Sequence, residues 1–215
     1  DYPVIYVLDG SLDEDFIHIV GVVQFNSFSW LNFMPESIVV GIANVDRKRD
    51  FTYKSNDAID QRELPTSGGA KQFIDFVKSE VKPLINERYR TNGKGTLIGQ
   101  SLGGLLATQV LIEMPDLFDN YLIVSPSLWW DQESLLAKPV KVSESKPKVY
   151  VGVGNEGSTM IRVATSLVDK VNRAYQQRGY VSYGYFDELD HGDTLHLAAY
   201  AGLKALFKDT KEATD

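Results

Sequence analysis

The sequence predicts an α/β fold, a mostly parallel sheet with helices on both of its faces. Short runs of β-branched and aromatic residues, which are typical of buried strands, alternate along the chain with segments whose apolar residues recur at helical spacing. One strand and helix of this series are joined by Gly99-Gln100-Ser101-Leu102-Gly103, a G-x-S-x-G turn. Such alternation means crossover connections and hence a mostly parallel sheet. Since 215 residues are enough for one domain of good size, we expect a single α/β domain over residues 1–215.

Six strands are expected, each with the composition of a strand buried in a parallel sheet. They are Tyr2–Leu8, Ser37–Ile42, Thr96–Ile98, Tyr121–Val124, Lys148–Val153 and Tyr180–Phe186. In such a sheet the functional groups collect at the carboxyl ends of the strands. The candidate groups that follow strand ends are Gly10-Ser11, Ser101, Glu156 and His191.

The helices are expected from amphipathic spacing and from their end signals. They are Asp15–Phe25, Ala70–Tyr89, a helix from Leu102 that ends before Pro115, Asp131–Ala137, Thr159–Arg178 and Leu195–Phe207. We expect Pro83 to kink or restart its helix, Gly179 to end the fifth helix and Thr194 to cap the last. Polar Ala43–Gly69 is expected to form a long loop, and charged Lys208–Asp215 a frayed tail.

The composition excludes several classes of function. The chain has a net charge of −7 and no run rich in Lys or Arg, so neither a nucleic acid nor an anionic membrane is an expected partner. It contains no Cys, which excludes disulfides, Cys-ligated metals and a Cys nucleophile but leaves the compartment open. No segment approaches the ~18 apolar residues of a membrane span. The oligomeric state also stays open.

The turn around Ser101 has the pattern of a nucleophile elbow. Such a Ser sits at a strained backbone angle with its hydroxyl projecting from the sheet edge, and side chains at the flanking Gly99 and Gly103 would clash with strand and helix. The helix from Leu102 directs its free N–H groups at the site, where negative charge develops in acyl transfer. The alternative is an ordinary Ser in a Gly-rich turn, but the strand before and the helix after favour a nucleophile.

A Ser nucleophile needs a base, and His191 is the candidate because it follows the last strand. His18 and His196 lie within helices and are interpreted as packing or surface residues. Glu156 ends the fifth strand and is the favoured acid to orient the imidazole. Three carboxylates near His191 in sequence are alternatives: Asp187, Asp190 and Asp193.

An oxyanion hole requires two backbone donors. One is expected from the N–H of Leu102, directly after the nucleophile. The second is expected from the loop after the first strand, at Gly10 or Ser11. Gly10 has an alternative interpretation as a simple turn residue.

Five segments, in this order, carry a resemblance: DYPVIYVLDG, SIVVGIANVDRKRDFT, LIGQSLGGLLA, SPSLWWD and DHGDT. They resemble the serine esterase family of the α/β-hydrolase superfamily that includes the enterobactin and salmochelin esterases. The resemblance covers almost the whole chain and implies hydrolysis of carboxylic esters through an acyl-enzyme, without metal or organic cofactor. Its motifs match Ser101 and His191, and Glu156 stands at the usual acid position. Many relatives have His where this chain has Gln100.

The resemblance leaves several functions open. A Ser–His dyad is the alternative to a Ser–His–Glu triad, since the salmochelin esterase is described as using such a pair. An acyltransferase on the same machinery would accept an alcohol in place of water. A catalytically silent binding module of the same fold is a third hypothesis, against which intact Ser101 and His191 argue.

Four residues are candidates for contact with a small-molecule ester. Trp129 and Trp130 follow a strand end and could form a wall of the substrate pocket, although large aromatic residues also build cores. Arg47 and Arg49 could bind an acidic or catecholate substrate, although charged runs are often solvated loops.

The site positions also predict the place of the strands. Nucleophile, acid and His follow the third, fifth and sixth expected strands, which match strands five, seven and eight of the eight-strand α/β-hydrolase plan. Tyr2–Leu8 is then the third strand of that plan, and Ser37–Ile42 is the fourth, at an edge of the sheet. Since Ser37–Ile42 has no charge or Pro to protect an edge, we expect an upstream hairpin, outside these residues, to cover it.

Overall fold

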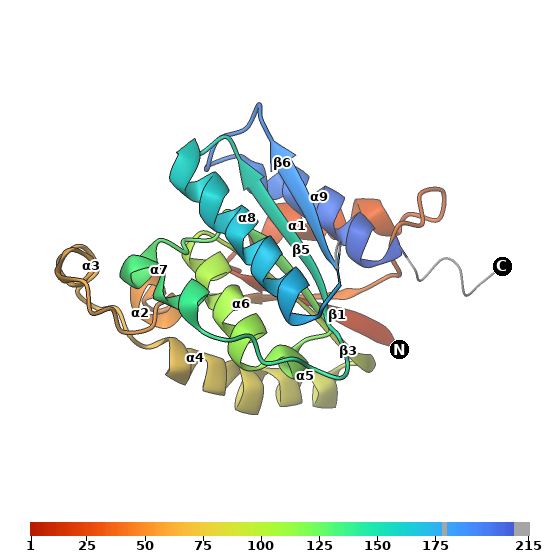
Figure 1. Cartoon of the computed structure of the whole chain (residues 1–215). Coiled ribbons are helices and arrows are strands. Elements are labelled where there is room, and N and C mark those ends of the chain that lie inside the picture. The colour runs from red at the N-terminus through yellow and green to blue at the C-terminus, as the bar shows by residue number, and fades with distance from the viewer. Residues whose placement is uncertain (178–179, 209–215) are drawn as a thin grey trace.

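A single sheet of six parallel strands forms the centre of the molecule (Figure 1). The computed structural model describes residues 1–177 and 180–208. The strands are β1 (Tyr2–Leu8), β2 (Ile38–Ile42), β3 (Thr91–Gln100), β4 (Asn120–Val124), β5 (Lys148–Gly154) and β6 (Val181–Phe186). Their order across the sheet is β2-β1-β3-β4-β5-β6, and every neighbouring pair is parallel. The predicted fold class and all six strands are confirmed.

The helices lie in two layers, because the side chains of each strand alternate between the two faces of the sheet. On one face, residues such as Leu97 pack against α4 (Ala70–Phe76), α6 (Leu102–Glu113) and α8 (Gly157–Ala174). On the other, residues such as Ile98 pack against α1 (Phe16–Ser27) and α9 (Thr194–Leu206). Figure 1 shows α6 and α8 in front of the sheet and α1 and α9 behind it. Each fully buried aliphatic side chain contributes about 1.5–3 kcal/mol to this core.

Several boundaries differ from the predictions. Strand β3 begins at Thr91 rather than Thr96, since Thr91 and Gly95 pair with β1 although the segment between them is polar. Ala43–Gly69 is not one long loop, because it contains α2 (Arg47–Phe51) and α3 (Ala58–Glu63), which are too short to give a periodic signal. Their first turns are capped by the carboxylates of Asp46 and Asp57.

Three predicted helix signals have different outcomes. Before Pro83 the chain forms a π-helical turn, η1 (Val77–Val81), and α5 (Lys82–Arg88) restarts there as expected. Thr194 does not cap α9: it is the first residue of the helix, and its hydroxyl donates to the carbonyl of Asp190. Gly179 and residues 209–215 lie outside the described residues.

Two further elements complete the described part of the chain. A 3₁₀ turn, η2 (Pro115–Leu117), follows α6, and α7 (Trp130–Ala137) follows β4.

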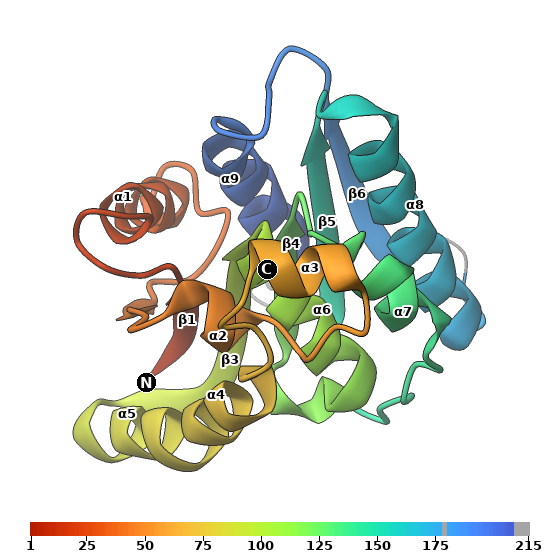
Figure 2. The ribbon, with the colours of Figure 1, turned by 90° about the vertical axis from the view of Figure 1, so that its left-hand side faces the viewer.

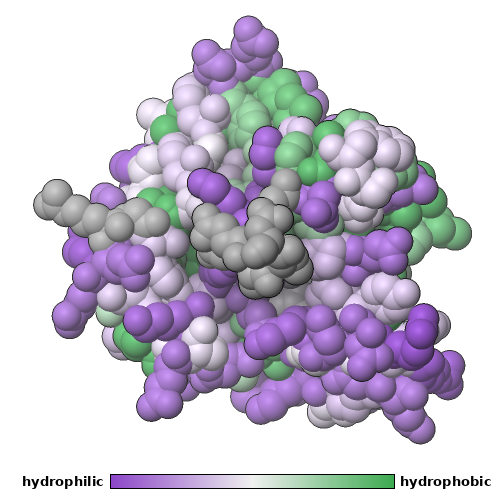
Figure 3. All heavy atoms as spheres, turned by 90° about the vertical axis from the view of Figure 1, so that its right-hand side faces the viewer, coloured by the Kyte–Doolittle hydropathy of each residue, from purple (hydrophilic) through white to green (hydrophobic). Residues whose placement is uncertain are grey.

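The carboxyl ends of the strands meet at one side of the molecule, which faces the viewer in Figure 2. There α2 and α3 lie in front of the sheet, and the connection from β6 to α9 lies at the top. On the opposite side, Figure 3 shows hydrophilic side chains over the lower half of the face. Among the described residues, no helix has the length and apolar character needed to cross a membrane. Within the described sheet, strand β2 pairs only with β1, so it forms the predicted sheet edge.

Candidate active site

Ser101 stands at the tight turn between β3 and α6. Its backbone is at φ 58° and ψ −119°, a conformation that side-chain-bearing residues rarely adopt. A Cβ on Gly99 would lie 2.4 Å from the carbonyl oxygen of Gly103, so strand and helix approach this closely only with glycine at that position. The local geometry is that of a nucleophile elbow.

The Ser101 hydroxyl is held by a residue that the sequence did not indicate. Ser101 Oγ lies 3.3 Å from Ser127 Oγ, and the Ser127 N–H donates to the Ser101 carbonyl at 3.0 Å. Within the described residues no hydrogen bond joins Ser101 to His191. In enzymes without substrate this contact is often longer than in the reacting complex, so the arrangement suits a resting state.

His191 and Glu156 are in direct contact. The Nδ1 atom of His191 hydrogen-bonds to Glu156 Oε2. The other oxygen of Glu156 accepts two more hydrogen bonds, from the Ser125 hydroxyl and from the Gly154 N–H. Only 2% of the Glu156 side chain is exposed, whereas 48% of the His191 side chain is. The carboxylate therefore fixes one ring nitrogen of His191, and no described residue hydrogen-bonds to the other, Nε2.

The two partners shift each other's pKa. Burial opposes ionisation of Glu156, but the hydrogen bonds from His191, Ser125 and Gly154 outweigh burial and lower its pKa. The hydrogen bond to Glu156 raises the pKa of His191, against partial burial and the nearby charge of Arg47. Glu156 is thus held ionised beside a ring with increased affinity for a proton, as a base partner requires.

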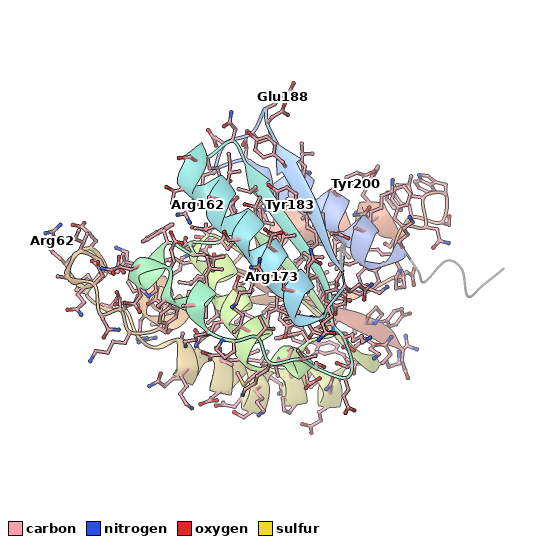
Figure 4. All side chains as sticks on the ribbon, viewed as in Figure 1. Arg62, Arg162, Arg173, Tyr183, Glu188 and Tyr200 are labelled. Carbon is pink, nitrogen blue, oxygen red and sulfur yellow. The ribbon has the colours of Figure 1, made fainter. Side chains whose placement is uncertain are left out.

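The alternative acids near His191 have other contacts. Asp190 accepts a hydrogen bond from the Gly192 N–H at 2.7 Å, and Asp193 accepts one from the Asp190 N–H at 2.8 Å. Both carboxylates therefore shape the loop between β6 and α9. Figure 4 shows Glu188 at the outer tip of this loop, beyond the end of the sheet.

The expected oxyanion donors are not equally available. The Gly10 N–H donates to the Ile42 carbonyl at 3.0 Å, which corrects its expected role. Its glycine character has a steric reason, because a Cβ there would lie 2.4 Å from the nitrogen of Ile42. Among the described residues, the N–H groups of Ser11 and Leu102 have no hydrogen-bond partner, so these two remain the candidate donors.

Arg47 and Arg49 each form an ion pair with a carboxylate. Arg47 donates through Nε and Nη2 to Asp9 at 2.7 and 2.9 Å, and Asp9 is a buried residue with φ 52° at the end of β1. Arg47 thus fixes the loop that carries Ser11 and keeps Nη1 for another contact. Arg49 pairs with Asp50 at 2.8 Å and lines a separate cavity of about 490 Å³ with Phe73.

The two tryptophans have different environments. Trp130 is completely buried, and its indole N–H donates to the Tyr53 carbonyl at 2.9 Å. It is a core residue, so the expectation that it lines an open substrate pocket is corrected. Trp129 is 38% exposed and is still available for contact with a ligand.

The remaining histidines lie away from Ser101, on α1 and α9. His18 pairs with Asp15 at 3.0 Å, and its ring centroid lies 5.6 Å from that of His196. Among residues 1–177 and 180–208, no group of three or more His, Asp or Glu side chains could hold a metal ion. The described residues thus offer a Ser, a His–Glu pair and two backbone donors as the reactive groups.

A comparison with known families matches residues 1–197 to the family described as "Putative esterase". The chain belongs to this family. Within it, the chain is 35% identical over 150 residues to ferri-bacillibactin esterase BesA of Bacillus subtilis, an alignment that covers 64% of this chain and 52% of that relative. The chain therefore matches about half the length of this curated relative.

Solved structures of similar proteins have the same fold. An IroE-like serine hydrolase from Shewanella oneidensis superimposes with a TM-score of 0.81 at 30% identity, covering 97% of this chain and 71% of that one. The BES protein from Bacillus cereus gives a TM-score of 0.81 at 29% identity, with coverage of 94% and 82%. The predicted resemblance to siderophore esterases and the α/β-hydrolase fold are confirmed.

Proposed function

We propose that this esterase-family chain hydrolyses carboxylic esters through an acyl-enzyme on Ser101. The observation that carries the proposal is that a Ser in an elbow turn lies at the same carboxyl edge of the sheet as a His whose ring is bound to a buried carboxylate. Family membership supports the same chemistry, and a relative and a structural neighbour are named as an esterase and a serine hydrolase.

The proposed reaction uses the residues in fixed roles. Ser101 Oγ attacks the ester carbonyl while His191 Nε2 takes the hydroxyl proton, and Glu156 stabilises the imidazolium that forms. The carbonyl oxygen becomes an oxyanion, which the N–H groups of Leu102 and Ser11 bind. The C–O bond then breaks, and His191 gives its proton to the leaving alcohol. Water, deprotonated by His191, attacks the acyl-enzyme and releases the acid and Ser101.

The proposed substrates are siderophore esters, because the matched relatives act on such compounds by name. Iron-binding acyl groups are rich in anionic oxygens, which a guanidinium recognises well. The free Nη1 of Arg47 and the exposed ring of Trp129 are the proposed contacts for the acyl part.

The test is a panel of p-nitrophenyl, feruloyl and siderophore esters, assayed with the wild-type chain, Ser101→Ala and His191→Ala. We expect hydrolysis by the wild type and a fall in kcat of about 10⁴–10⁶ for each variant. The siderophore esters should give the highest kcat/KM of the panel. Preference for simple esters would contradict the substrate class, and comparable activity of Ser101→Ala would contradict the mechanism.

A further inference from the structure

Gln100 connects the nucleophile turn to the loop that carries His191. Its side-chain Nε2 donates a hydrogen bond of 2.7 Å to the main-chain carbonyl of His191. Gln100 is the last residue of β3 and directly precedes Ser101. A displacement of the His191 backbone relative to Ser101 therefore has to break or stretch this bond.

The direction of the Gln100 side chain follows from the sheet. Gln100 lies two residues after Ile98, so both point to the face that α1 and α9 cover. The loop from β6 enters α9 on that face, and it brings the His191 carbonyl over the end of β3. This contact therefore depends on the strand order and cannot be seen in either segment alone.

The remaining contacts of the loop do not fix the distance between His191 and Ser101. The Asn155 N–H donates to the Leu189 carbonyl at 2.7 Å, and Glu156 holds the His191 ring, so both contacts attach the loop to the segment after β5. In the part of the chain that the structure describes, the Asp190 and Asp193 carboxylates form hydrogen bonds only within the loop. Among the described residues, Gln100 makes the hydrogen bond between this loop and the β3–α6 turn.

We propose that Gln100 is a positioning residue, which sets the separation of the His191 ring from Ser101 through its hydrogen bond to the His191 carbonyl. Reacting groups need placement well within 1 Å, and an error of that size lowers a rate by about 100-fold. Gln100 touches neither substrate nor reacting atoms in this role. The inference rests on the proposed function of Ser101 and His191.

The test measures the second-order rate of Ser101 labelling by a fluorophosphonate, together with kcat and KM for an ester. Gln100→Leu keeps the side-chain size and removes the donor, and we expect labelling and kcat about 10- to 100-fold lower, with KM within about threefold. Gln100→His restores an N–H at a similar reach and should recover most of the rate. Gln24→Leu makes the same substitution at an exposed site on α1 and serves as the matched control.

The pH profile separates positioning from stability. His191 is influenced by Glu156, Arg47 and Asp190, and Glu156 raises its pKa. If the loop shifts in Gln100→Leu, the Glu156 contact weakens and the acid limb of kcat/KM moves to lower pH. A structural role alone would change the melting temperature and leave the acid limb in place.

Two results would overturn the proposal. One is a labelling rate of Gln100→Leu within about twofold of the wild-type rate, while Ser101→Ala is not labelled. The other is unfolding of both Gln100→Leu and the isosteric Gln100→Glu at the assay temperature, which would make Gln100 a stability residue. Activity of Ser101→Ala would instead reject the proposed function itself, so the two failures are distinguishable.

Discussion

At the scale of residues, the role of Glu156 decides whether the site is a Ser–His–Glu triad or a Ser–His dyad. Its side chain is almost completely buried, and its two oxygens accept hydrogen bonds from three different groups, those of Ser125, Gly154 and His191. Hydrogen bonds to a carboxylate that hold it ionised and oriented are what an orienting acid needs. A solvent-facing turn carboxylate would have neither the burial nor these donors.

Glu156→Gln is therefore expected to lower kcat strongly, by up to about 10⁴, because an amide facing Nδ1 favours the wrong imidazole tautomer. Asp187→Asn is the matched control, since Asp187 is exposed and was an alternative acid from the sequence. We expect this control to stay within about threefold of wild type. A loss of less than about tenfold in Glu156→Gln would favour the dyad.

The same variant predicts a change in pH dependence. The Glu156 hydrogen bond raises the pKa of His191, so the neutral base is lost as the pH falls through a value above the ordinary one for His. Replacing the carboxylate removes this effect, and the acid limb of kcat/KM should move to lower pH. A limb that stays in place would show that another group controls the ionisation.

Which contacts of the site can be predicted from the sequence depends on how far apart the partner residues lie along the chain. Ser101 has a local motif, and His191 and Glu156 follow strand ends, so the contact between His191 and Glu156 could be expected. Ser125, Ser127 and Gln100 have no local signal, because their partners lie 26 to 91 residues away. The hydrogen bond from the Gly10 N–H to the Ile42 carbonyl could not be predicted either, since it depends on how β1 pairs with β2.

At the scale of elements, the β3–α6 turn depends on close backbone contact. Gly99→Ala would bring a Cβ to 2.4 Å from the Gly103 carbonyl, and no side-chain rotation can relieve a contact with main-chain atoms. We expect a loss of about 2 kcal/mol or more in the free energy of unfolding. Thermal unfolding measures it as a fall of several degrees in Tm.

Gly21→Ala provides the matched control. Gly21 lies in α1, and no atom comes within 4 Å of an added Cβ. Alanine there should raise stability by about 0.5–1 kcal/mol, because glycine weakens a helix interior. Equal Tm values for Gly99→Ala and wild type would contradict the steric account of the elbow.

Elements with strong apolar signals were the ones predicted well. Tyr2–Leu8 forms β1 with the expected ends, since all its residues from Pro3 on are buried. The helices α2 and α3 were missed, because their caps at Asp46 and Asp57 act over five- and six-residue helices with little periodicity. Helices this short thus lack the periodic signal on which a sequence prediction depends, even where a capping residue precedes them.

At the scale of the whole molecule, strand order places the site. The chain runs from β1 outward to β2 and then returns to β3 on the other side of β1. The loops after β1 and β3 consequently lead to opposite faces, to α1 and to α6, and a crevice at such a switch point is the usual ligand site of an α/β sheet. Ser11 follows β1 and Ser101 follows β3, so the two residues lie on the two sides of this switch point.

The most direct test of the account is covalent labelling of the whole chain by a fluorophosphonate, read by intact mass and by peptide mapping. We predict one adduct per chain on Ser101, none on Ser101→Ala, and labelling at least about 10³-fold slower for His191→Ala. A wild-type chain that resists the reagent, or equal labelling of Ser101→Ala, would contradict the claim that Ser101 is an activated nucleophile.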